Sequence, residues 1–168
     1  MYTLLPALDE KQVEELVALR GELTMLDSVG HRLRVGKNIL EKESKYQYSR
    51  WFSWNRHQRA KYSSIIPENI VKRSLQCWFL EFSPHTGFLD TMTVWVGSKG
   101  CGTVIAYALQ DGMHINLEGD TVYVKKGEGI AFRLSTVHQV NESPLGGLWA
   151  CTMIRGCHTT CKQDNSTQ

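Results

Sequence analysis

The sequence predicts a mainly β fold, an antiparallel sandwich or barrel covered by an N-terminal helix. Short runs with alternating apolar side chains follow one another after residue 74, at 75–82, 91–96, 103–109, 113–117, 121–125, 130–138 and 148–154. Turn-forming pairs such as Ser83-Pro84 and Asp111-Gly112 separate them. Because no helical pattern intervenes between these runs, a doubly wound parallel sheet is excluded.

The N-terminal helix is expected over residues 10–24. Asp9 can cap this helix, and Gln12 stands where it completes a capping box. Apolar side chains share one face of the helix, namely Val13, Leu16 and Val17. That face predicts a helix that packs on the sheet.

Length and charge indicate an ordinary single domain. The chain has 168 residues and a net charge of +2, which gives no general reason to expect nucleic acid or an acidic membrane as a partner. No apolar stretch approaches the ~20 residues that span a bilayer, and the N-terminus lacks a secretory pattern, so we expect a cytoplasmic protein. We expect residues 1–156 to form one domain, in which 1–72 covers a core of 73–156, and 157–168 to be a flexible tail.

The cysteines argue against a disulfide scaffold. There are five, an odd number without a regular framework, so reduced thiols are expected. Three of them gather with a histidine near the C-terminus, but the spacing of Cys151, Cys157, His158 and Cys161 fits no standard zinc module.

Residues 45–62 have the strongest local bias of the chain, because they contain many basic and aromatic side chains and no acidic one. Cations suit phosphates and flat rings suit stacked bases, so this composition is typical of a nucleotide or nucleic-acid surface. The side chains expected to contact such a ligand are Arg50, Trp51, Trp54, Arg56 and Arg59. The alternative is a structural segment whose aromatic rings fill the mouth of the barrel while its charges are solvated.

Residues 119–141 contain two short strands separated by a turn at Gly127, with His138 at the end of the second strand. A histidine in this place can present its imidazole from a rigid strand end to a cavity, as a metal ligand must. The alternative is a histidine that only forms a hydrogen bond at the strand end.

The same region resembles two known families. The features that resemble the second motif of the cupins are Gly119-Asp120, Gly127, His138 and Asn141. Residues 132–140 equally resemble the strand that carries the distal histidine of iron(II) and 2-oxoglutarate-dependent oxygenases. Both families share an antiparallel double-stranded β-helix, or jelly roll, and the resemblance implies this fold for about residues 75–156.

The resemblance to the oxygenases implies an iron(II) site of two histidines and one carboxylate, with open positions for 2-oxoglutarate and oxygen. On this interpretation the ligands are His85, Asp90 and His138, which keep the order found in the family. The family usually has the first two as His-x-Asp, whereas four residues separate His85 from Asp90. This offset places the two side chains on opposite faces of a strand unless the chain bends, and Gly87 permits a bend.

The family also has an arginine or lysine on the strand after the distal histidine, which pairs with the far carboxylate of 2-oxoglutarate. Residues 147–149 hold no cation here, so Arg155 and Arg133 are the nearest candidates for this role. The cupin interpretation lacks the first cupin motif, and His114 alternates with apolar neighbours that turn it outward.

These observations leave three functions open. The first is an iron(II)/2-oxoglutarate-dependent oxygenase that hydroxylates a substrate held under residues 45–62. The second is a jelly-roll binding or interaction protein without catalysis, which explains the departures from the oxygenase pattern. The third is nucleotide or nucleic-acid binding through residues 45–62, alone or with either of the others. No signature of another enzyme class occurs, and the sequence does not indicate an oligomeric state.

Overall fold

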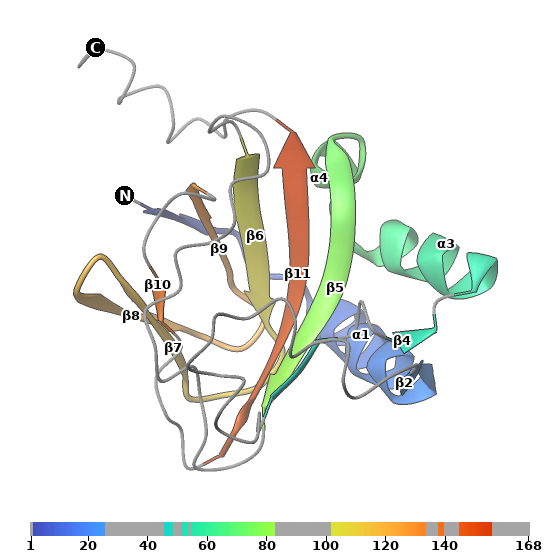
Figure 1. The fold of residues 1–168 in the computed structure, drawn as a ribbon, viewed down its shortest axis with the longest axis horizontal. Coiled ribbons are helices and arrows are strands. Elements are labelled where there is room, and N and C mark those ends of the chain that lie inside the picture. Colours follow the sequence, from blue (N-terminus) through green and yellow to red (C-terminus); the bar gives the residue numbers. More distant parts are fainter. Residues whose placement is uncertain are drawn as a thin grey trace.

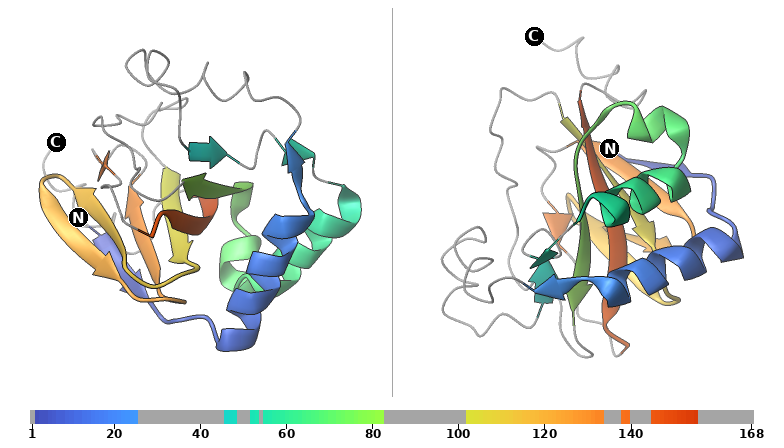
Figure 2. Two further views of the ribbon diagram at one scale, coloured as in Figure 1. Left: turned by 90° about the horizontal axis from the view of Figure 1, so that it is seen from below. Right: turned by 90° about the vertical axis from the view of Figure 1, so that its right-hand side faces the viewer.

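The computed structural model describes residues 2–25, 46–48, 52–53, 55–82, 102–133, 138–139 and 145–155. Two antiparallel sheets face one another, and helices cover the outer face of the larger sheet (Figures 1 and 2). The strand expected at 91–96 and the tail expected at 157–168 lie outside the described residues. Within the described part, no helix has both the length and the apolar character needed to cross a membrane.

The larger sheet has six strands in the order β1-β9-β6-β11-β5-β3. Their bounds are β1 Tyr2–Leu5, β3 Tyr46–Tyr48, β5 Ser74–Phe82, β6 Gly102–Ala108, β9 Gly129–Arg133 and β11 Gly147–Arg155. The smaller sheet has the order β10-β7-β8, with β7 at Met113–Leu117, β8 at Asp120–Val124 and β10 at His138–Gln139. A separate pair joins β2 (Thr24–Met25) to β4 (Phe52–Ser53). Every pairing among the described strands is antiparallel, which confirms the predicted fold class.

Strands β7 and β8 form a hairpin with a two-residue loop. Glu118 and Gly119 have positive φ angles of 51° and 91°, as a type I′ turn requires. Asn116 Oδ1 accepts a hydrogen bond from the Gly119 N–H at 2.9 Å. This turn sets the register that places Leu117 opposite Asp120.

Every residue of β6 is buried, and its side chains point alternately into two apolar cores, one on each face of the larger sheet. Ile105 and Tyr107 point toward the helices, into what we call the helix-side core. Val104 and Ala106 point between the two sheets, into what we call the interior core. The buried members of the interior core are Leu80, Val104, Ala106, Ala108, Met113, Ile115, Leu117, Val122, Val124, Ile130, Phe132, Trp149 and Cys151.

Helix α1 (Glu10–Glu22) begins at the predicted capping box. Asp9 Oδ1 accepts from the Gln12 N–H at 2.8 Å, and Gln12 Oε1 accepts from the Asp9 N–H at 2.9 Å. The predicted apolar face is wrong at Val17, which is 43% exposed, whereas Leu19 is fully buried. The buried residues of the helix, Val13, Leu16 and Leu19, are spaced three apart, so its buried face includes Leu19 and leaves Val17 outside.

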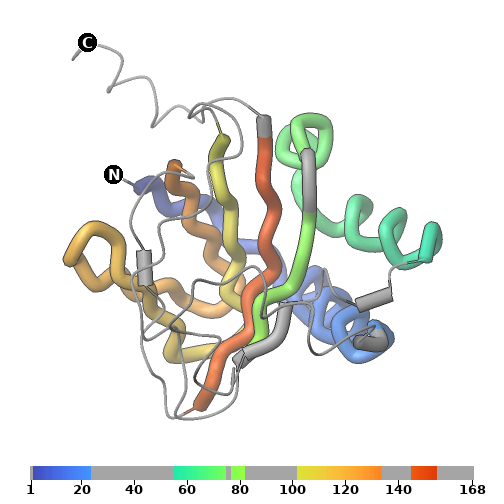
Figure 3. Tube along the Cα trace, viewed as in Figure 1, coloured from blue at the N-terminus to red at the C-terminus, as the bar shows by residue number. Residues whose placement is uncertain are grey.

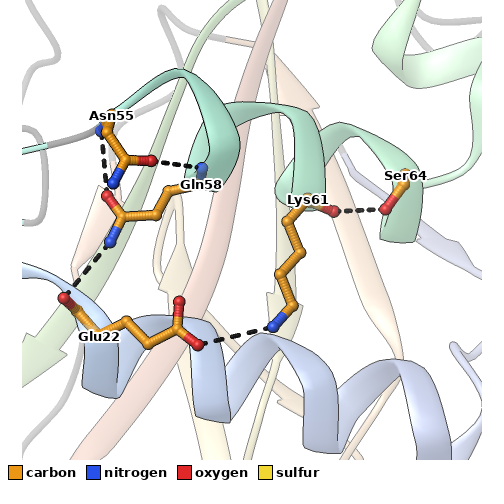
Figure 4. Close-up of polar contacts among 5 residues, drawn as sticks. All are labelled: Glu22, Asn55, Gln58, Lys61 and Ser64. Atoms are coloured by element: carbon orange, nitrogen blue, oxygen red, sulfur yellow. Dashed lines mark hydrogen bonds and ion pairs between the residues drawn. The ribbon is translucent and has the colours of Figure 1, made fainter.

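Helix α3 (Arg56–Ile65) lies beside α1 on the same face of the sheet (Figure 2). Its start has a second capping box, in which Asn55 Oδ1 accepts from the Gln58 N–H at 2.8 Å and Gln58 Oε1 accepts from the Asn55 N–H at 3.0 Å. Gln58 Nε2 also donates to the Glu22 carbonyl at 3.4 Å, and Lys61 Nζ lies 3.6 Å from Glu22 Oε1 (Figure 4). The start of α3 is thereby joined to the end of α1.

Tyr62 anchors α3 to the sheet and is 2% exposed. Its hydroxyl donates to the Cys151 carbonyl at 2.9 Å and lies 3.1 Å from Thr152 Oγ1, while its ring packs edge-on against Phe79 at a centroid distance of 5.7 Å. Burial raises the pKa of this hydroxyl well above its ordinary value of 10.0. The short helix α4 (Glu68–Val71) then leads into β5.

Candidate functional site

The interior core is the place where a ligand enclosed by the two sheets would lie. Its described residues are apolar apart from an indole N–H and a thiol, which belong to Trp149 and Cys151. Among the described residues, no three His, Cys, Asp or Glu side chains lie together as a metal site requires. The buried part of this core therefore supplies shape and exclusion of water, and the basic residue of an inward row, Arg155 opposite Gly102, lies at the far end of β11.

Trp149 lies near the start of β11, opposite Leu80 on β5 and Ala108 on β6. Its side chain is 2% exposed. Its Nε1 atom is buried and has no hydrogen-bond acceptor in the described part of the chain. An unsatisfied buried donor is uncommon in native proteins, so this atom needs an explanation.

Cys151 lies two positions further along β11 and is also buried. Burial raises the pKa of its thiol well above the ordinary range, so the thiol stays protonated at neutral pH. A protonated, enclosed thiol is neither a nucleophile nor a thiolate metal ligand.

The register of β10 places His138 opposite Leu117. Residues that are directly opposed in an antiparallel pair share one face, and Leu117 belongs to the interior core. Position 138 therefore lies in a row that faces the interior.

His114 lies opposite Tyr123, which is 73% exposed, and the two rings are 5.7 Å apart, which confirms that His114 faces outward.

The other two predicted metal ligands, His85 and Asp90, lie outside the described residues. They follow β5 in the sequence, and β5 ends at Phe82 opposite Gly147, the first residue of β11. The complete ligand set stays a prediction.

The two arginines predicted to hold 2-oxoglutarate lie at the other end of the larger sheet. Arg155 ends β11 opposite Gly102, the first residue of β6, and these strands run side by side (Figure 3). Since β11 has nine residues, Arg155 is roughly 26 Å from the end at Gly147. Arg133 ends β9 opposite Thr103, again at the start of β6.

The face occupied by Arg133 also differs from the predicted one. Thr103 lies between Arg133 and Ile154 in one row across the sheet, and Ile154 packs in the helix-side core. Arg133 therefore belongs to the row that faces the helices. A cosubstrate in the interior core at the start of β11 is out of reach of this residue.

The basic and aromatic segment 45–62 is divided among three elements, β3, β4 and α3. Arg56 and Arg59 are exposed on α3, while Tyr62 of the same helix packs in the helix-side core. This part of the segment thus covers the outer face of the larger sheet, and its aromatic ring, Tyr62, packs there and not in the barrel mouth that the structural alternative expects. Arg50, Trp51 and Trp54 lie outside the described residues.

Comparisons with known proteins identify the fold. No protein-family model matches the chain, and no curated protein matches its sequence. A prolyl hydroxylase from Trichoplax adhaerens, solved with a hypoxia inducible factor peptide, is similar with a TM-score of 0.54 and 12% identity, over 99% of this chain and 87% of that one.

Two other solved structures are similar over about half of this chain. One is the salicylate 1,2-dioxygenase of Pseudoaminobacter salicylatoxidans, with a TM-score of 0.37 and 12% identity over 48% of this chain and 20% of that one. The other is an RmlC-like cupin of Desulfovibrio desulfuricans, with a TM-score of 0.40 and 12% identity over 49% of this chain and 73% of that one. The chain thus spans about a fifth of the dioxygenase. The chain has a cupin-like double-stranded β-helix, as the sequence predicts.

Proposed function

We propose that this chain is a non-haem iron(II)/2-oxoglutarate-dependent oxygenase that hydroxylates an organic substrate. The observation that carries the proposal is the register of His138, which lies opposite Leu117 in a row that faces the interior. The likeness to a prolyl hydroxylase supports the same architecture, because it extends over 99% of this chain, helices included.

His85, Asp90 and His138 are the residues proposed to hold iron(II). Two imidazoles and a carboxylate leave coordination positions open, and iron(II) with a 2-oxo acid supplies the activation of dioxygen there. The apolar interior core suits this role, since it keeps water from the reacting groups. The far carboxylate of 2-oxoglutarate fits less well, because Arg133 and Arg155 lie at the opposite end of the sheet.

Anaerobic iron loading tests the proposal. We expect stoichiometric iron in the natural protein and none in the triple variant His85→Ala, Asp90→Ala, His138→Ala. His114→Ala is the matched control, because His114 faces outward and should leave iron content unchanged. Once dioxygen is admitted, the iron-loaded natural protein should release carbon dioxide from 2-oxoglutarate, and the triple variant should not. Equal iron content in the natural protein and the triple variant would reject the ligand set.

A double-stranded β-helix without catalysis is the second candidate. The observation that favours it is the apolar packing of the interior core, in which Trp149 lies near the start of β11, while Arg155 lies in an inward row only at the far end of that strand. Such a protein would act as a binding or interaction scaffold. Iron-free protein after loading, with the fold intact by circular dichroism, would support this candidate.

A further inference from the structure

Strand β8 lies at an edge of the smaller sheet, because among the described strands it has a neighbour, β7, on one side only. The β7–β8 hairpin is on the side of the molecule away from α1 and α3 (Figure 1). Thr121 and Tyr123 are exposed on β8, and Tyr123, at 73%, has the most exposed large apolar side chain in the described part of the protein. Residues 121–124 carry no charge, although charged side chains commonly prevent contact between edge strands.

The hairpin turn determines which backbone groups of β8 point away from β7. Leu117 and Asp120 flank the two-residue loop, so they form its first hydrogen-bonded pair, and such pairs alternate with non-bonded pairs along an antiparallel ladder. The N–H and C=O groups of Thr121 and Tyr123 therefore point away from β7, along what we call the free edge of β8. The next outward N–H, that of Lys125, donates to a carboxylate of its own turn at 2.9 Å, so the free edge ends there.

Opposite charges mark the two ends of β8, and all of them are exposed. Glu118 and Asp120 form an acidic end at the hairpin turn, whereas Lys125 and Lys126 form a basic end. A second copy of β8, laid antiparallel across a two-fold axis at Val122, brings the acidic end of each copy beside the basic end of the other. Glu118 is then opposite Lys126, with Asp120 on the diagonal. Parallel pairing would instead bring like charges together.

The same axis also matches the uncharged residues. It places Thr121 of one copy opposite Tyr123 of the other, so the outward N–H and C=O groups of these residues meet as hydrogen-bonded pairs. The two Tyr123 side chains lie on a diagonal of the outer face, about 7–8 Å apart at the backbone and within reach of each other. The His114 ring, 5.7 Å from that of Tyr123, adjoins this contact.

We propose that the free edge of β8 pairs antiparallel with β8 of a second copy of this chain, which joins the two smaller sheets across a two-fold axis. The inference does not depend on iron or on the proposed function. The contact is centred on one pair of five-residue strands and is smaller than a standard interface, so we expect a dissociation constant of roughly 10–100 μM.

Charge reversal at each end tests the pairing and its direction. Lys125→Glu with Lys126→Glu makes both ends of β8 acidic, and Glu118→Lys with Asp120→Lys makes both ends basic. In sedimentation velocity, each double variant alone should dimerise at least about tenfold more weakly than the natural protein. An equimolar mixture of the two should dimerise to within about threefold of the natural protein, because each acidic end again meets a basic end.

Arg56→Glu with Arg59→Glu is the matched control. It changes the net charge by as much as the lysine reversal does, but on α3, at the other side of the molecule (Figure 1), so it should leave dimerisation unchanged. Thermal unfolding checks that every variant is folded.

Hydrogen exchange of the natural protein tests the same contact without a substitution. The amides of Thr121 and Tyr123 should exchange about fivefold more slowly at about 1 mM than in dilute solution, because the second copy protects them. The amides of β8 that point to β7 should exchange at one rate at both concentrations.

Three outcomes would overturn the inference. They are a natural protein that stays monomeric at about 1 mM, a mixture that dimerises no better than its components, and a dimer that leaves the Thr121 and Tyr123 amides unprotected. Restored dimerisation in the mixture, together with protection of these two amides, would support it whether or not the protein binds iron.

Discussion

Gly127 joins three parts of the chain through its backbone. Its N–H donates to the Ala108 carbonyl at 2.7 Å, and its carbonyl accepts from the Leu8 N–H at 2.9 Å. Its φ is +88°, and a Cβ atom here would lie 3.0 Å from the Leu8 carbonyl oxygen. We expect Gly127→Ala to lower the free energy of unfolding in urea by ~2 kcal/mol or more, because left-handed strain adds to the displaced backbone contact.

Gly119→Ala is the matched control for this prediction. Gly119 has a φ of +91°, but a Cβ atom added here would meet nothing within 4 Å, so only the conformational cost of ~1–2 kcal/mol applies. Equal losses for the two substitutions would show that the contact with Leu8 contributes nothing.

Buried acidic hydrogens make the fold sensitive to alkali. Burial raises the pKa of the Cys151 thiol above its ordinary value of 9.0 and that of the Tyr107 hydroxyl to about 12. Each raised pKa contributes stability that is fully present below the unfolded value and is lost as pH rises above it. The free energy of unfolding should fall by ~1.4 kcal/mol per pH unit for each such group, beginning at about pH 9 for Cys151 and at about pH 10 for Tyr107.

Cys151→Ala should make the free energy of unfolding fall less steeply with pH in alkali, because one titrating group is removed. Urea unfolding at pH 8 and at pH 10 measures the slope for both proteins, and the comparison of slopes is independent of the cavity that the substitution creates. A variant that keeps the full slope would contradict the role assigned to this thiol.

The start of α3 depends on its cap, which also joins it to α1. Asn55→Ala removes the acceptor for the Gln58 N–H, and we expect a loss of ~1 kcal/mol in the free energy of unfolding. Asn55→Asp keeps the acceptor and places a negative charge at the positive end of the helix, so it should retain the stability. Thermal unfolding compares the two, and similar melting temperatures would argue against the cap.

In the described part of the basic segment, α3 has two exposed arginine side chains that a nucleic acid could contact. Arg56 and Arg59 are three positions apart on this helix, so they lie on adjacent turns of one face. If the segment binds nucleic acid, the double variant Arg56→Glu, Arg59→Glu should weaken binding and flatten its salt dependence by about 0.7 to 0.9 log–log units per lost phosphate contact.

Trp51→Ala separates stacking from charge in the same assay. Stacking releases no counterions, so this substitution should weaken binding by ~1–3 kcal/mol while it leaves the salt slope intact. Binding that is insensitive to salt and to both variants would remove the support for a nucleic-acid surface.

At the scale of the molecule, the two cores share the strands of the larger sheet and should unfold together. Leu19 is 0% exposed in the helix-side core, and Leu19→Ala should cost ~2–5 kcal/mol. Val17→Ala is the control, because Val17 is 43% exposed on the same helix. Near- and far-ultraviolet circular dichroism should report one coincident transition for Leu19→Ala, and two separate transitions would contradict a single domain.

Local patterns in the sequence determine much of this fold. Alternation predicts β7 at the residues where it is found and β5, β6 and β11 to within a few residues, because a half-buried strand needs a period of two. The capping box predicts the start of α1, and the glycine turns predict the β7–β8 hairpin, since these depend on neighbours a few residues away. The prediction that His138 closes the strand beginning at residue 130 is wrong, because β9 ends at Arg133 in the larger sheet and position 138 lies on β10 of the smaller sheet.

Only the tertiary structure determined which residues from distant segments of the chain lie close together. Strand register puts Arg133 and Arg155 at the far end of the larger sheet, and helix packing puts Arg56 and Arg59 on its outer layer. It also leaves the Trp149 donor without an acceptor among the described residues. These relations join segments far apart in the chain, and periodicity within one segment contains no information about which residue of another lies opposite it.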